Sequence, residues 1–244
     1  MKMLSWNVRG TGSFHKHAAI KSTLRAITPI ITGLIETKAE NFESQDIVAF
    51  WGGNGVNWEV SLALNNAGGL LLMWDSNAIT VENLLKTPRL ICFVMSIIQE
   101  AFTCAIYLLY APNDQSDRTI FWNWLGSLMY NVNAPMLFIG DFNEVLTPEE
   151  RKHATRLTSS MRKFGAWVQD LGLVDIKIQN KKFTWMIANS ASKIDRFLVA
   201  HDWLGAFQSL NAYCREKPLS DHLAIILDTE AKDSGLKPFR SLDC

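Results

Sequence analysis

The sequence predicts an α/β fold in which two β-sheets pack face to face and helices cover the outside. Short apolar runs of strand length dominate the chain, and turn-forming Gly and Asn residues separate them. Fewer segments carry apolar residues at helical spacing. The 244 residues are 48% hydrophobic and 20% charged, which is enough apolar chain for one large core. Many strands with occasional helices are typical of two packed sheets with outer helices.

Two buried strands with a helix between them are predicted at the start of the chain. Residues 3–8 form the first apolar run, and residues 30–35 form the second, which ends at Glu36. Between them, apolar residues recur at helical spacing: Ile20, Leu24 and Ile27. Pro29 closes this helix, because proline cannot continue it.

The next segment, residues 47–110, is predicted to be mostly strand. Turn signals lie at residues 52–55 and 65–69. Residues 90–98 and 101–110 are long apolar runs joined by a polar pair, which predicts a hairpin of two long strands.

Two helices and two strands are predicted in the remainder. Ser116 can cap a helix whose apolar face is Ile120, Trp124 and Leu128. Residues 135–139 are a short buried strand. A second helix carries the following apolar residues: Met161, Phe164, Trp167, Val168 and Leu171. Gly172 ends this helix, and residues 223–227 form the last strand.

Charge and cysteine usage narrow the function classes. The formal net charge is zero, with 24 basic and 24 acidic residues, which argues against tight, charge-driven binding to DNA. A nuclease stays compatible, because clustered active-site carboxylates would offset basic residues elsewhere. The four cysteines lack CxxC spacing and close His partners, which argues against zinc: Cys92, Cys104, Cys214 and Cys244. Cys92 and Cys104 lie in apolar runs and are predicted to be buried free thiols.

The protein is expected to be nuclear or cytoplasmic and not secreted. Asn7 and Arg9 interrupt the apolar start, so no signal peptide is visible. The longest apolar runs are far shorter than the roughly 20 residues that span a membrane, so no membrane partner is expected. Since no linker or internal repeat divides the chain, residues 1–230 are predicted to form one domain.

Acidic and amide side chains appear repeatedly where an apolar run stops. They are Asn7, Glu36, Asn113, Asp141, Asn143, Asp195, Asp221 and, beside the last, His222. Taken singly, each is more often a turn former than a functional group. If these side chains converge on one sheet edge, they would supply the oxygen ligands that Mg²⁺ prefers. The histidine among them would suit proton transfer or charge stabilisation at a phosphate.

The order of these motifs resembles the successive signatures of the endonuclease/exonuclease/phosphatase superfamily, which includes apurinic/apyrimidinic endonucleases, DNase I and phosphoinositide phosphatases. The motifs are LSWNVRG at 4–10, LIETK at 34–38, YAPN at 110–113, GDFN at 140–143, SKIDR at 192–196 and SDH at 220–222. They span residues 3 to about 227. The resemblance implies a four-layer sandwich of two mostly antiparallel sheets.

Within the superfamily the sequence most resembles the endonuclease domain of plant LINE-type (non-LTR) retrotransposons. The segments are GDFNEVL at 140–146 with Glu150-Arg151, LGLVD at 171–175, FTW at 183–185 and IDRFL at 194–198. Residues 236–240 resemble the connector that leads to a reverse transcriptase, which implies that residues 231–244 are a truncated C-terminal connector. A full-length element would therefore supply that domain as a partner, and the isolated chain is expected to be a monomer.

The resemblance implies a metal site and a base. Glu36 would be the main carboxylate ligand of Mg²⁺, with Asn7 beside it and Asp221 in support. Mn²⁺ would fit the same oxygen ligands. Asp141 would position or deprotonate the attacking water.

The resemblance also implies phosphate contacts. Asn143 and His222 would donate hydrogen bonds to the phosphate oxygens, and Asp195 would orient His222. Further contacts to substrate are predicted at Tyr110, Asn113, Arg118, Trp185 and Ser220. For Trp185, packing in the core is an equally good interpretation.

Three functions are open at this point. The first is a Mg²⁺-dependent endonuclease that nicks DNA and leaves a 3′-hydroxyl, as in target-primed reverse transcription. The second is a phosphatase of the same fold that acts on phosphoinositides or nucleotides. The third is an inactive, retrotransposon-derived remnant that acts as a binding module, because intact motifs do not prove activity.

Overall fold

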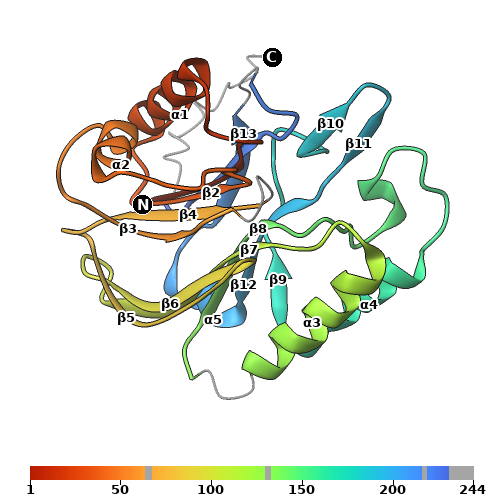
Figure 1. Ribbon diagram of the computed structural model, residues 1–244. Helices are drawn as coiled ribbons and strands as arrows, with labels where there is room; N and C mark the ends of the chain where they lie inside the picture. Colours follow the sequence, from red (N-terminus) through yellow and green to blue (C-terminus); the bar gives the residue numbers. More distant parts are fainter. Residues whose placement is uncertain (64–67, 130–132, 216–218, 231–244) are drawn as a thin grey trace, which may run out of the picture.

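Two six-stranded sheets form the centre of the molecule, and helices lie on both outer sides (Figure 1). The structure is a computed structural model that describes residues 1–63, 68–129, 133–215 and 219–230. The predicted four-layer sandwich is therefore confirmed. The predicted turn at 65–69 falls largely outside the described residues, and the predicted connector at 231–244 falls wholly outside them.

The first sheet has the strand order β13-β14-β1-β2-β4-β3. Its strands are β1 (Lys2–Asn7), β2 (Ile31–Ile35), β3 (Val56–Ser61), β4 (Leu70–Asp75), β13 (Asn211–Arg215) and β14 (Ala224–Asp228). Only β1 and β2 run parallel, and the other neighbouring pairs are antiparallel. The two predicted N-terminal strands therefore lie side by side and end at the same edge.

The second sheet has the strand order β5-β6-β7-β8-β12-β9. Its strands are β5 (Ile79–Thr87), β6 (Leu90–Ile97), β7 (Phe102–Tyr110), β8 (Met136–Asp141), β9 (Leu173–Asp175) and β12 (Asp195–Ala200). The β6–β7 hairpin confirms the predicted pair of long strands. A separate hairpin of β10 (Trp185–Ile187) and β11 (Ser190–Ser192) projects beside this sheet (Figure 1).

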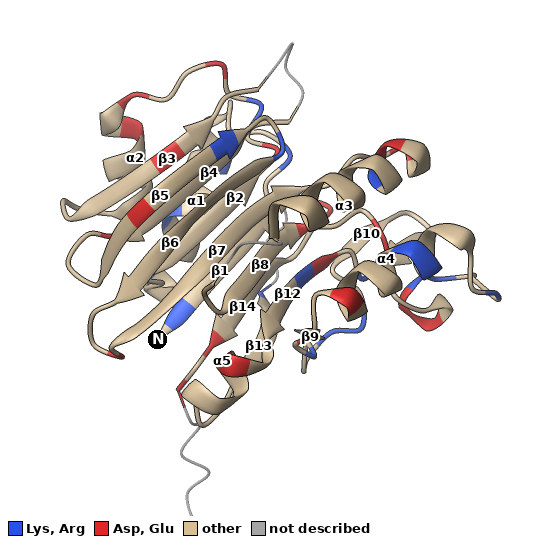
Figure 2. Ribbon diagram, turned by 90° about the horizontal axis from the view of Figure 1, so that it is seen from below, with Lys and Arg blue, Asp and Glu red and all other residues tan. Residues whose placement is uncertain are grey.

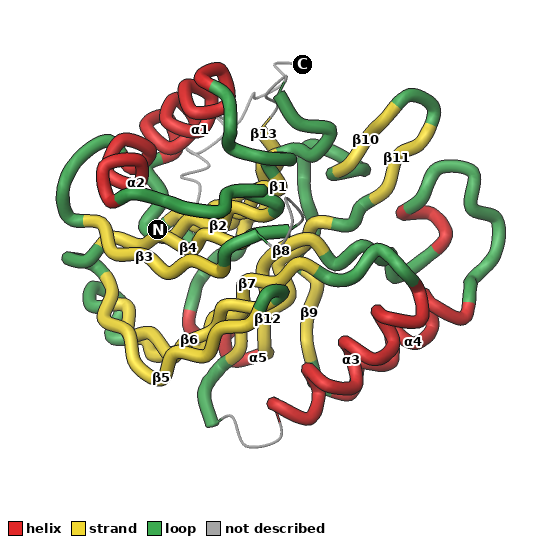
Figure 3. Tube along the Cα trace, in the orientation of Figure 1, coloured by secondary structure: helices red, strands yellow, loops and turns green. Residues whose placement is uncertain are grey.

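The helices lie outside the strands (Figure 3). They are α1 (Phe14–Ile27), α2 (Ser44–Trp51), α3 (Gln115–Met129), α4 (Ser159–Asp170) and α5 (His201–Ala206), with a 3₁₀ turn at Pro148–Glu150. The pair α1 and α2 covers the first sheet, and the pair α3 and α4 flanks the second (Figure 3). Among the described helices, none combines the length and the apolar character needed to cross a bilayer.

Three local predictions are wrong. Residues 44–51, partly included in the predicted strand region, form α2, whose start is fixed by reciprocal bonds between Glu43 and Asp46. In α3 the predicted face is not the buried one, and Ile120 is 67% exposed. The buried residues of α3 are Arg118, Phe121, Trp122, Leu125 and Met129. The cap is also different, because Asp114 accepts the backbone N–H groups of Ser116 and Asp117.

Apolar side chains from both sheets meet in one continuous core. The charged residues lie mainly at strand ends and on helices and loops, and the middles of the long strands are mostly uncharged (Figure 2). As predicted, Cys92 and Cys104 are buried free thiols. Gly33 in β2 marks how closely the sheets approach, because a Cβ there would lie 2.5 Å from Cδ1 of Leu108 and 3.4 Å from Cδ1 of Ile139.

Gly33→Ala is expected to lower the free energy of unfolding by about 1–3 kcal/mol, because the added methyl must displace packed side chains of the opposite sheet. Urea unfolding measures this change. Gly205→Ala in α5 is the matched control, since no heavy atom lies within 4 Å of the new Cβ. A Gly33→Ala protein as stable as the parent would contradict the tight packing of the sheets.

Candidate active site

The predicted site residues converge because five strands end or begin at the same edge of the sandwich. Of the parallel strands β1 and β2, β1 ends at Asn7, and β2 ends at Ile35, directly before Glu36. In the second sheet β7 and β8 are also parallel and end at Tyr110 and Asp141. Asp195 begins β12 directly opposite Asp141 in the antiparallel pair. The carboxylates thus come from separate segments to one place.

A buried triad of two carboxylates and one imidazole forms the centre of this edge. Nδ1 of His222 lies 3.0 and 3.1 Å from the two carboxylate oxygens of Asp195. Nε2 lies 3.8 Å from Oδ2 of Asp141. Asp141 also accepts hydrogen bonds from Nδ2 of Asn7 (3.0 Å) and from the backbone N–H of Asn143 (2.9 Å). All three members of the triad are almost inaccessible to solvent.

The charges of the triad control its protonation. Burial disfavours the imidazolium, but the carboxylates of Asp195 and Asp141 outweigh it and raise the pKa of His222 to about 9. The histidine is therefore protonated at neutral pH: Nδ1 is bonded to Asp195, and Nε2 carries a second hydrogen that it can donate. Burial and the nearby charge of Asp195 raise the pKa of Asp141, against the opposing effect of His222. Asp141 is thus a stronger base than a surface aspartate.

The FTW segment holds this triad in place. Oγ1 of Thr184 accepts the backbone N–H groups of Ile194 (3.1 Å) and Asp195 (3.0 Å). Trp185 pairs with His222 through an isolated antiparallel bridge. Its indole Nε1 donates to Oδ2 of Asp221 (2.8 Å). The motif therefore positions the start of β12 and the segment before β14 at the same time.

A second acidic group lies beside the triad. Glu36 is 6% exposed, and its Oε1 accepts the hydroxyl of Tyr110 (3.1 Å). Burial and the charge of Glu36 raise the pKa of the Tyr110 phenol, so it stays protonated and remains a donor. Arg9 reaches both Glu36 and Asp221, with Nη1 3.0 Å from Oε2 of Glu36 and Nε 3.0 Å from Oδ1 of Asp221.

The donor set beside Glu36 fits a hard divalent cation. Oε2 of Glu36 is buried and accepts no well-formed hydrogen bond, despite its closeness to Arg9. Carboxylate oxygens are the ligands that Mg²⁺ and Mn²⁺ prefer, and Asp221 and the amide of Asn7 add oxygens nearby. Strain is also concentrated here, because Arg9, Glu36 and Asn143 all have left-handed backbones with φ of 51°, 53° and 50°.

The triad itself is a second place where a cation could be held. Ligand atoms of Asp141, Asp195 and His222 lie within 4.8 Å of one another. However, Nδ1 of His222 is already held by Asp195, and both carboxylate oxygens of Asp141 already accept hydrogen bonds, from Asn7 and Asn143. We therefore favour the oxygen-rich side at Glu36 for the metal and the triad for proton transfer.

The remaining predicted residues surround this centre. Asn143 donates its side-chain amide to the carbonyl of Ala111 (2.8 Å). Ser220 donates to the carbonyl of Asn7 (2.7 Å) and accepts the N–H of His222 (3.1 Å), so it ties two site segments together. Asn113 is exposed on the loop after β7.

The structure does not bring Arg118 to the site. Its side chain is buried under α3, where it forms an ion pair with Glu144 at 3.1 Å and donates to the carbonyl of Pro112 at 3.1 Å. Glu144 also pairs with Arg151, at 3.2 Å. Arg118 therefore supports the loop that carries Asn113, to whose carbonyl it also donates.

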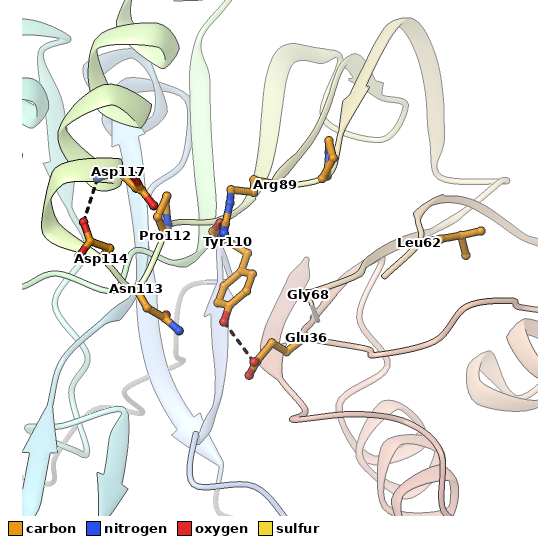
Figure 4. Close-up of a pocket in the computed structure, with 10 residues that line it drawn as sticks. Glu36, Leu62, Gly68, Arg89, Tyr110, Pro112, Asn113, Asp114 and Asp117 are labelled. Carbon is orange, nitrogen blue, oxygen red and sulfur yellow. Dashed lines mark hydrogen bonds between the residues drawn. The ribbon is translucent and has the colours of Figure 1, made fainter. Parts of the chain in front are cut away.

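A cleft opens beside Glu36 and Tyr110 (Figure 4). Its volume is about 460 Å³, and Arg89 and Asn113 line the side across from Gly68. Sequence reasoning missed two residues of the site, Arg9 and Thr184. Their positions inside the first motif and inside FTW were the available signals.

Comparisons with known proteins agree with this geometry. Residues 4–222 match the Endonuclease/Exonuclease/phosphatase family. No curated protein matches the chain.

Solved structures share the fold at low sequence identity. An AP endonuclease from Archaeoglobus fulgidus is similar with a TM-score of 0.75 and 18% identity, over 95% of this chain and 100% of that one. The 3′ phosphatase NExo from Neisseria, bound to a product DNA hairpin, is similar with a TM-score of 0.70 and 16% identity, over 95% of this chain and 100% of that one. A mannosyl-6-phosphatase from Bacteroides thetaiotaomicron is similar with a TM-score of 0.62 and 12% identity, over 93% of this chain and 98% of that one. Since the family match covers most of the sequence and the fold agrees, the chain belongs to the endonuclease/exonuclease/phosphatase family.

Proposed function

We propose that the protein is a Mg²⁺-dependent phosphodiesterase that nicks DNA and leaves a 3′-hydroxyl. The observation that carries this proposal is the pairing of a buried Asp141–His222–Asp195 triad with the carboxylate of Glu36 at one edge of the sandwich. Hydrolysis of a phosphodiester needs a positioned base, donors for the phosphate oxygens and a cation. The site offers residues for each of these tasks.

The triad can divide the chemistry between its members. Asp141 accepts a proton from a water molecule as the water oxygen attacks phosphorus. The P–O3′ bond breaks on the opposite side, and the departing oxygen takes a proton from solvent to become the 3′-hydroxyl. Protonated His222 donates from Nε2 to a phosphate oxygen, and Asp195 holds the ring through Nδ1. The phenol of Tyr110 orients Glu36. A metal ion held by Glu36, Asp221 and Asn7 would neutralise charge on the phosphate and on the departing oxygen.

DNA is proposed as the substrate, since one similar structure is described with a DNA hairpin and another as an AP endonuclease. The FTW hairpin and the Glu150-Arg151 segment, which resemble plant LINE-type endonucleases, further favour a nick that primes reverse transcription. Arg151 lies next to the hairpin, since it forms a bridge with Ser192.

Nicking of supercoiled plasmid tests the proposal. With Mg²⁺ the protein is expected to convert supercoiled plasmid to the open circle, and EDTA is expected to stop the reaction, because the carboxylates alone cannot neutralise the phosphate. Ends released by the nick are expected to be extended by a DNA polymerase, which requires a 3′-hydroxyl.

Parallel assays separate the rival functions. Release of phosphate from inositol phosphates or nucleotides, without nicking, would replace the nuclease by a phosphatase. Binding of DNA without turnover of any of these substrates would favour an inactive binding module. Nicking that is unchanged in EDTA would contradict the metal requirement.

A further inference from the structure

We propose that Arg9 is an internal counter-ion of the metal site, which competes with the divalent cation for Glu36 and Asp221 and so weakens metal binding. This inference rests on the metal role of Glu36 in the proposed function. Its basis is the position of the guanidinium group, which contacts the carboxylates of both Glu36 and Asp221, while Oε2 of Glu36 accepts no well-formed hydrogen bond.

The contacts of Arg9 span both carboxylates. Nε and Nη2 form a fork on Asp221, at 3.0 Å from Oδ1 and 3.2 Å from Oδ2. Nη1 lies 3.3 Å from Oε1 of Glu36 and 3.0 Å from Oε2. The fork on Asp221 is well formed, whereas Oε2 of Glu36 accepts no well-formed hydrogen bond. The guanidinium thus balances the charge of Glu36 without saturating its oxygens.

The backbone of Arg9 is anchored, so only its side chain is free to move. The backbone N–H donates to Oδ1 of Asn7 (3.1 Å), and the next residue, Gly10, donates to the carbonyl of Glu36 (2.6 Å). Nζ of Lys16 donates to the carbonyls of Val8 (2.7 Å) and Arg9. The side chain itself is 36% exposed. It can therefore turn toward solvent when a cation takes its place beside Glu36.

Two cations of like charge cannot share these oxygens at no cost. A divalent ion beside Glu36 would be repelled by the guanidinium in a partly buried setting, where charges are poorly screened. Removing Arg9 leaves Glu36 and Asp221 without their nearest counter-ion, which strengthens their attraction for a metal. If Arg9 were only a structural link between the β1 loop and the segment before β14, its loss would reduce stability without strengthening metal binding.

Isothermal titration with Mn²⁺ in the absence of DNA tests this inference on the full chain. Arg9→Gln is expected to bind Mn²⁺ about tenfold more tightly than the parent, which corresponds to the loss of one competing charge-assisted contact. Arg9→Lys is expected to fall between them, because an ammonium cannot make the fork to Asp221 and reach Glu36 as well. Arg25→Gln, which removes the same charge from an exposed position of α1, is expected to leave Mn²⁺ affinity unchanged.

Unchanged or weaker Mn²⁺ binding by Arg9→Gln, with native circular dichroism, would overturn the role of Arg9. Should that variant fail to fold, Arg9→Lys decides the matter by the same criterion. The outcome is separable from the proposed function: if the parent nicks plasmid with Mg²⁺ but the Arg9 variants bind Mn²⁺ as the parent does, only this inference fails. If neither parent nor variants bind Mn²⁺ and plasmid stays intact, the metal-dependent function fails and this inference with it.

Discussion

Asp141→Asn is expected to reduce the rate of plasmid nicking by about a thousandfold, the range typical for loss of a positioned general base. The amide has nearly the shape of the carboxylate but cannot accept the proton of the attacking water. It also disturbs the local bonds. Both oxygens of Asp141 accept from donors, Asn7 and Asn143, so an NH₂ group placed there must face one of these donors.

Stability should change little in the same variant. The raised pKa of Asp141 means that the folded state binds its proton more tightly than the unfolded state, so the ionised carboxylate opposes folding as pH rises past its ordinary value. Asparagine removes the cost of burying an ionised carboxylate, which stabilises the folded state. It also loses one hydrogen bond, which destabilises the folded state. We expect the melting temperature at neutral pH to stay within about 3 °C of the parent, equivalent to about 1 kcal/mol.

Asp202→Asn, an equivalent change at an exposed position in α5, is the matched control and should leave nicking intact. Single-turnover nicking of a plasmid at saturating Mg²⁺ measures both variants. An Asp141→Asn protein that nicks within about threefold of the parent would remove Asp141 from proton transfer, because a general base contributes far more than this.

The sequence predicts the convergence of the site better than the details around it. Strand ends were recognisable from short apolar runs followed by Asn7, Glu36 or Asp141, and the parallel pairs β1–β2 and β7–β8 bring those ends to one edge. The register that sets Asp195 opposite Asp141 depends on long-range pairing, which no local pattern reveals. The predicted pairing of Asp195 with His222 came from the family resemblance.

The wrong predictions of secondary structure and of a buried helix face arose where the apolar residues fit two alternatives equally well. The run at 47–51 is continuous and apolar, so periodicity alone cannot separate a strand from a short helix. In α3 both faces carry large apolar residues, and only the packing against β7 and α4 decides that Trp122 is buried and Ile120 is exposed. The ion pair of Arg118 with Glu144 was not predictable from local patterns, because the two residues are 26 positions apart in the sequence.

Gly140→Ala is expected to lower the free energy of unfolding by roughly 4 kcal/mol or more, among the largest effects for one substitution. Gly140 has φ of +141°, where side chains other than glycine are strained, and an added Cβ would lie 2.1 Å from the carbonyl oxygen of Leu109. That oxygen belongs to the backbone of β7, so it cannot move aside as a flexible side chain can. Strands β7 and β8 would have to separate at the residue before Asp141.

The glycine is therefore required for the close approach of β7 and β8. Urea unfolding measures the loss, and Gly165→Ala in α4, where nothing lies within 4 Å of the new Cβ, is expected to stabilise by about 0.5–1 kcal/mol. The nicking rate per folded molecule is expected to be lower in Gly140→Ala than in the parent, because Tyr110 and Asp141 end the two strands that are forced apart. If Gly140→Ala were as stable and as active as the parent, β7 and β8 would tolerate the methyl. The close pairing of these strands would then not be required to position Asp141.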